Sequence, residues 1–304
     1  MSGHLRVTVI VAAIDARATV AASLRGFAEE VRGRGDVLLV DSSSDDTPER
    51  AGRLALPGVR IVHASAGRLV PHLWHIGIEA TDTPLVALST AQMVPQPGWF
   101  EALLDRLEET GAAAVGGPIE PAPGLARLDQ AVYLQRYVNY LRPLGQGRLV
   151  EPPGDNALYR RDRLDGLEPL LSGGFWESEV HRVLRGRGEV LAMTDDAVLR
   201  FHGGALRSRV TGQRHRHARQ FGAQRAARMG DVERLVRTLA VPVVPWVLLH
   251  RIKSALAGRG EPLGHWLPAL PWLGLLLAAW STGEALGTWL GPAASPRAAE
   301  RSAA

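Results

Sequence analysis

Short apolar runs alternate with amphipathic segments up to residue 116, and this alternation constrains the fold more than any other feature of the chain. Five apolar runs predict strands at 7–11, 36–40, 59–63, 85–88 and 112–116. Helical spacing of apolar residues predicts helices at 18–32, 47–54, 72–80 and 99–110. Strands that alternate with helices predict a parallel α/β sheet, with a ligand site at the carboxyl ends of the strands.

Beyond this part the pattern is less regular. We expect a helix at 175–188, a strand at 190–199 and a long helix at 207–229. Between Ala197 and Gly230 the chain has eight arginines, three histidines and no acidic residue. Such a segment suits phosphate, acidic lipid or nucleic acid. Phe221 is its only aromatic residue within 207–229, and without interleaved stacking aromatics we do not expect nucleic acid as the partner.

The C-terminal part is apolar. Residues 238–256 are interrupted by prolines and followed by basic residues, which suits a helix lying in a membrane interface. Leu263–Leu290 carries tryptophans toward both ends and exceeds the ~20 residues that cross a bilayer. Pro268, Pro271 and Glu284 interrupt it, so a span, an in-plane helix and a soluble helical hairpin all stay open. We expect residues 231–292 to form an apolar helical membrane segment and residues 293–304 a disordered tail.

Several segments, in order, resemble glycosyltransferase family 2 of the membrane-associated bacterial type. VTVIVAAIDARATVAASL resembles its opening strand, loop and helix, and VLLVDSSSDDTPERA resembles its second strand and aspartate-serine loop. LVALSTAQMVPQPGWFEAL resembles the strand, metal motif and following helix. GDNALYRR and GFWESEVHRVLRGRG resemble the acceptor-side loop and the helix with the catalytic base. The resemblance implies a GT-A fold over residues 1–230, an α/β, Rossmann-like domain that binds a nucleotide-sugar donor, usually with a metal.

On this resemblance, Asp15 and Asp41 are candidate donor ligands. Asp41 would accept hydrogen bonds from the nucleoside base, although a turn-forming role explains it too. Asp15 would hold ribose or base, or would instead cap a helix. The family's Asp-x-Asp motif falls on Thr90-Ala91-Gln92, which leaves Thr90 and Gln92 as neutral donor-site residues. We therefore expect no metal site: Mg²⁺ or Mn²⁺ is possible in the family, but hard cations favour the charged oxygens that this motif lacks.

Cationic side chains are candidates to replace the metal at the diphosphate. Arg216 and Arg219 share a helical face in the basic segment, and Arg214, His215 and His217 lie around them. A basic helix on acidic lipid headgroups is the equally weighted alternative. His202 is a further candidate, because a histidine at this place approaches the metal or diphosphate in some relatives; a packing role is the simpler explanation.

On the acceptor side, Glu177 and Glu179 are candidates for the catalytic base of an inverting transfer. One carboxylate is needed to take the proton of the attacking hydroxyl. The two glutamates point apart on a helix, so we expect one to serve, and we favour Glu177; both would also suit the start of any helix. Asp155 and Asn156 are candidate sugar ligands, although turn chemistry explains them almost as well.

The sequence thus predicts an inverting glycosyltransferase, of hexosyltransferase type, with weak or no metal dependence. Its partners would be a nucleotide-sugar donor, a lipid-linked or cell-envelope glycan acceptor and membrane lipids. We expect it at the cell inner membrane, with the catalytic domain on the cytoplasmic face. The alternative is a catalytically inactive GT-A scaffold or glycan-binding protein, which the missing Asp-x-Asp motif favours.

Overall fold

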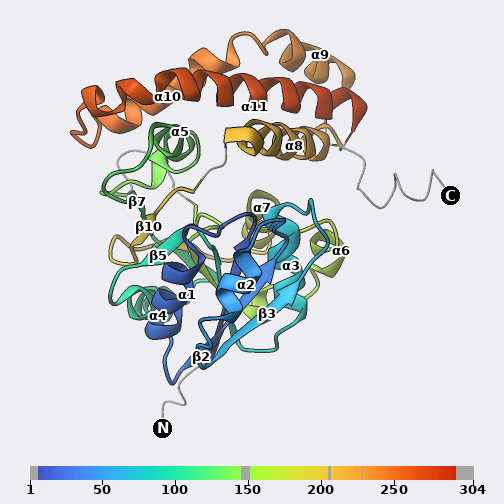
Figure 1. Ribbon diagram of the computed structural model, residues 1–304. Helices are drawn as coiled ribbons and strands as arrows, with labels where there is room; N and C mark the ends of the chain where they lie inside the picture. Colours follow the sequence, from blue (N-terminus) through green and yellow to red (C-terminus); the bar gives the residue numbers. More distant parts are fainter. Residues whose placement is uncertain (1–5, 145–150, 205–206, 228, 292–304) are drawn as a thin grey trace, which may run out of the picture. The chain divides into compact units, whose positions relative to one another are not determined.

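The computed structural model describes residues 6–144, 151–204, 207–227 and 229–291. The predicted disordered tail at 293–304 lies outside these residues. The chain divides into two compact units (Figure 1), one formed by residues 1–124 and 140–204, the other by residues 125–139 and 205–304. The second unit therefore begins before the boundary that we predict at residue 230, and includes the basic helix.

The first unit is built on a seven-stranded sheet in the order β3-β2-β1-β4-β8-β6-β9. Its strands are β1 (Val7–Ala13), β2 (Gly35–Asp41), β3 (Val59–His63), β4 (Leu85–Thr90), β6 (Ala114–Gly116), β8 (Ala157–Arg160) and β9 (Leu191–Met193). All neighbouring pairs are parallel except those of β8, which runs antiparallel to both β4 and β6. The expected α/β architecture is confirmed, but the sheet is mixed and not purely parallel.

Helices cover both faces of this sheet, because the residues of its central strands alternate between two apolar layers. Ile10 and Ala12 face the layer of α3 (Val70–Glu79) and α7 (Glu177–Gly186). The opposite face is covered by α1 (Val20–Glu30) and α4 (Trp99–Thr110), which meet where Phe27 and Trp99 pack edge to face at 5.1 Å. Three short helical segments, α2 (Thr47–Gly52), η2 (Arg161–Arg163) and α6 (Glu168–Leu171), follow β2 and β8.

A second sheet of three strands, in the order β5-β10-β7, completes the first unit. Its strands are β5 (Met93–Pro95), β7 (Ile119–Pro121) and β10 (Leu199–Phe201). The single strand that we predict at 190–199 is therefore wrong. The chain there forms β9 in the large sheet, leaves it over Thr194–Val198, and enters the small sheet as β10. The polar pair Asp195-Asp196 lies in the break, where no ladder partner is needed.

The second unit is helical. It contains α5 (Arg127–Arg136), α8 (Arg207–Ala226), α9 (Asp231–Leu239), α10 (Val244–Ala257), η3 (Leu263–Ala269) and α11 (Leu270–Leu290); η1 (Val138–Tyr140) lies where the chain returns to the first unit. Gln135 Nε2 donates to Leu276 O at 3.1 Å, which ties α5 to α11. Tyr133 stacks on Trp266 with ring centroids 5.6 Å apart. Figure 1 shows α8 beside α11, in line with the close contacts between them described below.

Candidate functional site

The loops that follow β1 and β2 interlock through hydrogen bonds. Asp15 adopts a left-handed backbone conformation with φ of 50°, a region that short polar residues tolerate. Its N–H donates to Ser43 Oγ at 2.8 Å, and its Oδ1 accepts from the Ser44 N–H at 2.9 Å and from Ser44 Oγ at 3.1 Å. Thr19, not Asp15, is the N-cap residue of α1. Asp15 thus joins the two loops, and a strained residue held in this way is typical of ligand sites.

Asp41 ends β2 beside these loops and is 3% exposed. Its Oδ1 accepts from Ser43 Oγ at 2.6 Å, and its Oδ2 lies 3.9 Å from His63 Nδ1. Burial raises the pKa of Asp41, and the hydrogen bonds from Ser43 oppose that shift only in part. The turn-forming role is therefore real. An N–H donor, such as the edge of a nucleobase, would also stabilise the charged form of a buried carboxylate with a raised pKa.

Thr90 and Gln92 lie at the carboxyl end of β4. Thr90 is 4% exposed, and its Oγ1 is buried without a hydrogen-bond partner in the part of the chain that the structure describes. A buried hydroxyl without a partner calls for an explanation, and a ligand supplies one. The His202 N–H donates to Gln92 O at 2.9 Å, so the fold brings His202 to this motif. Burial, and then the charge of Arg200, lower the pKa of His202 and favour its neutral form.

The residues at this motif do not fit a divalent cation. Thr90 and Gln92 offer neutral oxygens, and Ala91 offers no side-chain ligand. No group of three or more His, Cys, Asp or Glu side chains suited to a metal ion occurs among the described residues. Hard divalent cations are held in proteins chiefly by carboxylates.

The loop before β8 joins the Thr90 motif to the start of α7. Ser89, next to Thr90, donates through its Oγ to Asp155 O at 3.0 Å. The Trp74 indole N–H donates to Ser89 O at 2.8 Å. A methyl group on Gly154 would lie 2.7 Å from the Trp74 ring and 3.3 Å from Glu177 Cδ. The carboxyl group of Glu177 therefore lies beside the loop that is bonded to the residue preceding Thr90.

The two candidate bases have different surroundings at the start of α7. Glu177 is the first residue of the helix and is partly exposed. Its negative charge acts on the phenols of Tyr140 and Tyr159 and, after burial, contributes to raising the pKa of both. Glu179 is 9% exposed, and its Oε2 lies 3.4 Å from Arg182 Nε. Glu177 thus lies with the Asp155 loop, whereas Glu179 is engaged on its own helix.

Asn156 is a structural residue. Its side chain is fully buried, and its Oδ1 accepts from Trp99 Nε1 at 2.7 Å. Its Nδ2 donates to Pro118 O at 2.8 Å and to Ala197 O at 2.9 Å. Because all these amide bonds are made inside the protein, we assign Asn156 to holding the loop and no longer to contacting a sugar. Asp155 is 5% exposed, and its role as a sugar ligand stays a prediction.

The sequence did not point to a polar chain that runs from the part-exposed Glu151 to the buried His181 and Tyr159. Glu151 Oε2 lies 3.2 Å from His181 Nδ1, and His181 Nε2 lies 2.8 Å from the Tyr159 hydroxyl. The interaction with His181 lowers the pKa of Glu151, and Arg185 adds to the effect. His181 follows Glu177 by four residues on α7, so the two share a face. Helical spacing alone places His181 on the face of Glu177, but Tyr159 and Glu151 join it only through the fold.

Arg216 and Arg219 belong to the second unit. Arg216 is exposed, whereas Arg219 Nε donates to Gly291 O at 3.0 Å beside α11. Their role as diphosphate ligands stays a prediction.

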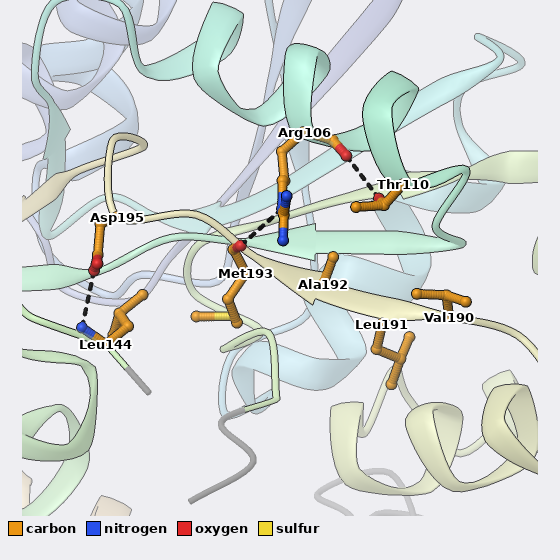
Figure 2. A pocket seen from close by; sticks show the side chains of 8 residues that line it. All are labelled: Arg106, Thr110, Leu144, Val190, Leu191, Ala192, Met193 and Asp195. Carbon is orange, nitrogen blue, oxygen red and sulfur yellow. Dashed lines mark hydrogen bonds between the residues drawn. The ribbon is translucent and has the colours of Figure 1, made fainter. Parts of the chain in front are cut away.

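A cavity of about 420 Å³ in the first unit lies away from these residues, along β9 and the end of α4. Figure 2 shows Arg106 above β9, where its Nε donates to Met193 O at 3.1 Å. Asp195 closes one end by accepting from the Leu144 N–H at 2.9 Å. None of the predicted site residues lines this cavity, and we do not place the reaction there.

Comparisons with known proteins identify the family and the fold. Residues 8–167 match the model of the family described as glycosyl transferase family 2. The chain is similar in structure to the mannosyltransferase PcManGT from Pyrobaculum calidifontis, solved with GDP-Man and Mn²⁺. The TM-score is 0.55 at 19% identity, over 93% of this chain and 87% of that one.

Two further likenesses are weaker. Glucosyl-3-phosphoglycerate synthase from Mycobacterium tuberculosis, with phosphoglyceric acid, gives a TM-score of 0.48 at 18% identity over 70% of this chain and 78% of that one. TarS residues 1–349 of S. aureus give 0.48 at 10% identity over 92% and 90%. No curated protein matches the chain in sequence. The family match spans more than half of the chain, and the GT-A fold accompanies it: this protein belongs to glycosyltransferase family 2.

Proposed function

We propose that the protein transfers a sugar, of hexose type, from a nucleotide-sugar donor to a lipid-linked or cell-envelope glycan, with inversion and with weak or no metal dependence. We further propose that it works at the cytoplasmic face of the inner membrane. One observation carries the transferase proposal: the hydrogen bond from Ser89 Oγ to Asp155 O joins the Thr90 motif to the loop beside Glu177. A donor at Thr90 and an acceptor at Glu177 would then share one loop.

In this reaction the acceptor hydroxyl attacks the anomeric carbon of the donor sugar from the side opposite the diphosphate. A bond forms between the acceptor oxygen and this carbon, and the bond from the carbon to the diphosphate oxygen breaks. Glu177 takes the hydroxyl proton, and the nucleoside diphosphate leaves with the electron pair. Asp41 and Asp15 would hold the nucleoside, Asp155 the sugar, and Thr90 Oγ1, with Gln92, would donate hydrogen bonds to the diphosphate region.

The leaving diphosphate needs positive charge or hydrogen-bond donors in place of a metal. In the first unit, His202 is held at the Thr90 motif by its bond to Gln92 O. Arg216 and Arg219 remain our proposed diphosphate ligands from the basic helix. The neutral Thr90-Ala91-Gln92 motif supports weak metal dependence, because it offers no carboxylate to a cation.

The test is hydrolysis and transfer with detergent-purified full-length protein and a panel of UDP-, GDP- and dTDP-sugars, each with Mn²⁺ and with EDTA. We expect one donor to turn over in EDTA at close to its rate in Mn²⁺. Turnover only with Mn²⁺ would refute metal independence. If the wild-type protein binds a donor without turning it over, and Glu177→Gln behaves in the same way, the result would instead support the inactive scaffold.

A further inference from the structure

We propose that the second unit binds an anionic bilayer in plane: α9 and the start of α10 insert into one leaflet, and α11 lies along the surface without crossing it. This inference rests on the membrane location in the proposed function and specifies how the protein is held there. Binding to vesicles can be measured without any sugar transfer, so the two proposals fail separately.

Exposed large apolar side chains are concentrated in the second unit. Within the described part of the chain, Val190 is the only exposed large apolar side chain of the first unit. The others are Val232, Leu235, Val236, Leu239, Val243, Trp246, Val247, Leu263, Leu267, Leu270, Leu275, Leu286, Trp289 and Leu290. Exposed apolar side chains gathered on one unit in this way mark a binding surface for a partner or a membrane.

The apolar face of helix α9 is exposed, whereas a helix of a soluble protein normally buries this face. Its apolar residues Val232, Leu235, Val236 and Leu239 recur at spacings of three and four and are 77%, 52%, 59% and 71% exposed. Arg234 and Thr238, away from these residues on the helix, are its only half-buried side chains. Arg234 Nη2 donates to Ala226 O at 2.8 Å. The Trp289 indole N–H also donates to Thr238 Oγ1 at 2.6 Å. An apolar face turned outward on a helix that is anchored by its polar face suits insertion into the acyl boundary of a bilayer.

The start of α10 continues this apolar surface and then gives way to positive charge. α9 and α10 are bent by 73° at a short break. After the break, Val243, Trp246 and Val247 are exposed, with Trp246 at 73%. His250, Arg251 and Lys253 follow on the same helix and are exposed as well. Tryptophan at the boundary, followed by cations, is the order in which a helix leaves the acyl region and meets anionic headgroups.

Helix α11 is long and apolar enough to span a membrane by composition, but its neighbour argues against a span. Methyl groups on Gly283 and Gly287 would lie 2.4 Å and 2.0 Å from the backbone oxygens of His215 and Arg219. A methyl group on Gly222 would lie 2.2 Å from Glu284 O. The backbones of α8 and α11 are therefore in direct contact between residues 215–222 and 283–287, without side chains between them.

Such contact between small residues also occurs between membrane-spanning helices, but there the partner is apolar. Here α8 carries several arginines, and Arg225 Nη1 pairs with Glu284 Oε1 at 2.7 Å in the C-terminal half of α11. A spanning α11 would draw these arginines into hydrocarbon, where each is costly. At the surface of the bilayer, by contrast, the arginines of α8 can stay in water or at headgroups.

The first experiment is co-flotation of the full-length protein with vesicles of phosphatidylcholine alone and of phosphatidylcholine with 30% phosphatidylglycerol. We expect binding to the anionic vesicles. Leu235→Gln and Leu239→Gln together should reduce it by about tenfold or more, because two exposed leucines lose their apolar burial in the bilayer. Val190→Gln, an equally exposed apolar residue of the first unit, is the matched control and should bind as wild type.

Arg251→Gln with Lys253→Gln should lower binding to anionic vesicles severalfold and leave weak binding to phosphatidylcholine unchanged. Leucine variants that float like wild type, with circular dichroism unchanged, would overturn the insertion of α9. So would wild-type protein that stays in solution as a dimer by light scattering, since the apolar face would then belong to a second copy.

The second experiment tests the orientation of α11 and exploits the absence of cysteine from the chain. Single cysteines are placed at Gly264 and at Leu290, on either side of α11, and labelled with a membrane-impermeant maleimide. If α11 lies in plane, both positions react in inside-out membrane vesicles of expressing bacteria and neither reacts in intact spheroplasts. Reaction of one position from each side would establish a span and overturn the proposal.

Discussion

A single methyl group at Gly154 should disturb both the stability and the activity of this enzyme. Gly154 has an ordinary negative φ, so alanine is compatible with its backbone, and the effect comes from packing alone. The added carbon would lie 2.7 and 2.8 Å from two atoms of the Trp74 ring and 3.3 Å from Glu177 Cδ. Trp74 cannot retreat easily, because it is 2% exposed and its indole N–H is bonded to Ser89 O at 2.8 Å.

The clash must therefore move the loop that holds Gly154 and Asp155. Overpacking of this kind costs ~1–3 kcal/mol. For a unit of this size, each kcal/mol lowers Tm by about 2–4 °C, so we expect a decrease of roughly 2–12 °C by calorimetry. A displacement near 1 Å beside a reacting group lowers turnover about 100-fold. Because Glu177 and Asp155 both border Gly154, kcat/KM for sugar transfer should fall by about that factor.

Gly186→Ala is the matched control on the same helix as Glu177. Its methyl group would meet nothing within 4 Å, so Tm should stay or rise by a few degrees and turnover should not change. A Gly154→Ala protein with wild-type Tm would refute the packing argument. A lowered Tm with full activity would refute the placement of the reaction beside Glu177.

Three further predictions address individual residues. Glu177→Gln should lower kcat at least 100-fold with little change in donor affinity by calorimetric titration, whereas Glu179→Gln should stay within a fewfold; the reverse order would assign the base to Glu179. Asn156→Ala should lower the free energy of unfolding by about 3 kcal/mol, because three buried partners lose their bonds, while alanine at the exposed Asn139 should cost little in urea denaturation. Burial lowers the pKa of His72 and His202 below the ordinary 6.5. Because the folded state favours their neutral forms, the free energy of unfolding should fall as pH decreases below about 6.5. In denaturation at pH 7.5 and 5.5, His72→Gln should reduce this difference in the free energy of unfolding between the two pH values. An unchanged difference would contradict the assignment.

The central strands and helices were predictable because their signals are local. The strand Val7–Ala13 is buried along its whole length and apolar except for Thr8. In Trp99–Thr110 the buried apolar residues recur at helical spacing. The break between β9 and β10 was not predictable in this way. Leu191 and Leu199 belong to different sheets, and neither the apolar pattern nor the length of the segment distinguishes one long strand from two short ones.

The site residues that end strands were predictable from motifs in the sequence. The residues whose role depends on partners distant in the sequence were not. Asp41 and Thr90 end β2 and β4 as expected. Asn156 has polar chemistry suited to a sugar, and its structural role depends on Trp99, Pro118 and Ala197, which come together only in the fold. Likewise, the pairing of Gln135 with Leu276 joins α5 to helices more than a hundred residues later, a contact without any local signal.

The reversed direction of β8 has a consequence for how this family can diversify. A parallel strand in the same position would present the loop that follows it at the edge where β1, β2 and β4 end. An antiparallel strand presents the loop that precedes it, so Gly154 and Asp155 reach that edge from the chain before β8. Insertions or deletions ahead of Pro153 can then reshape the surroundings of Glu177, while the register of the strands that lead to Asp15, Asp41 and Thr90 stays as it is.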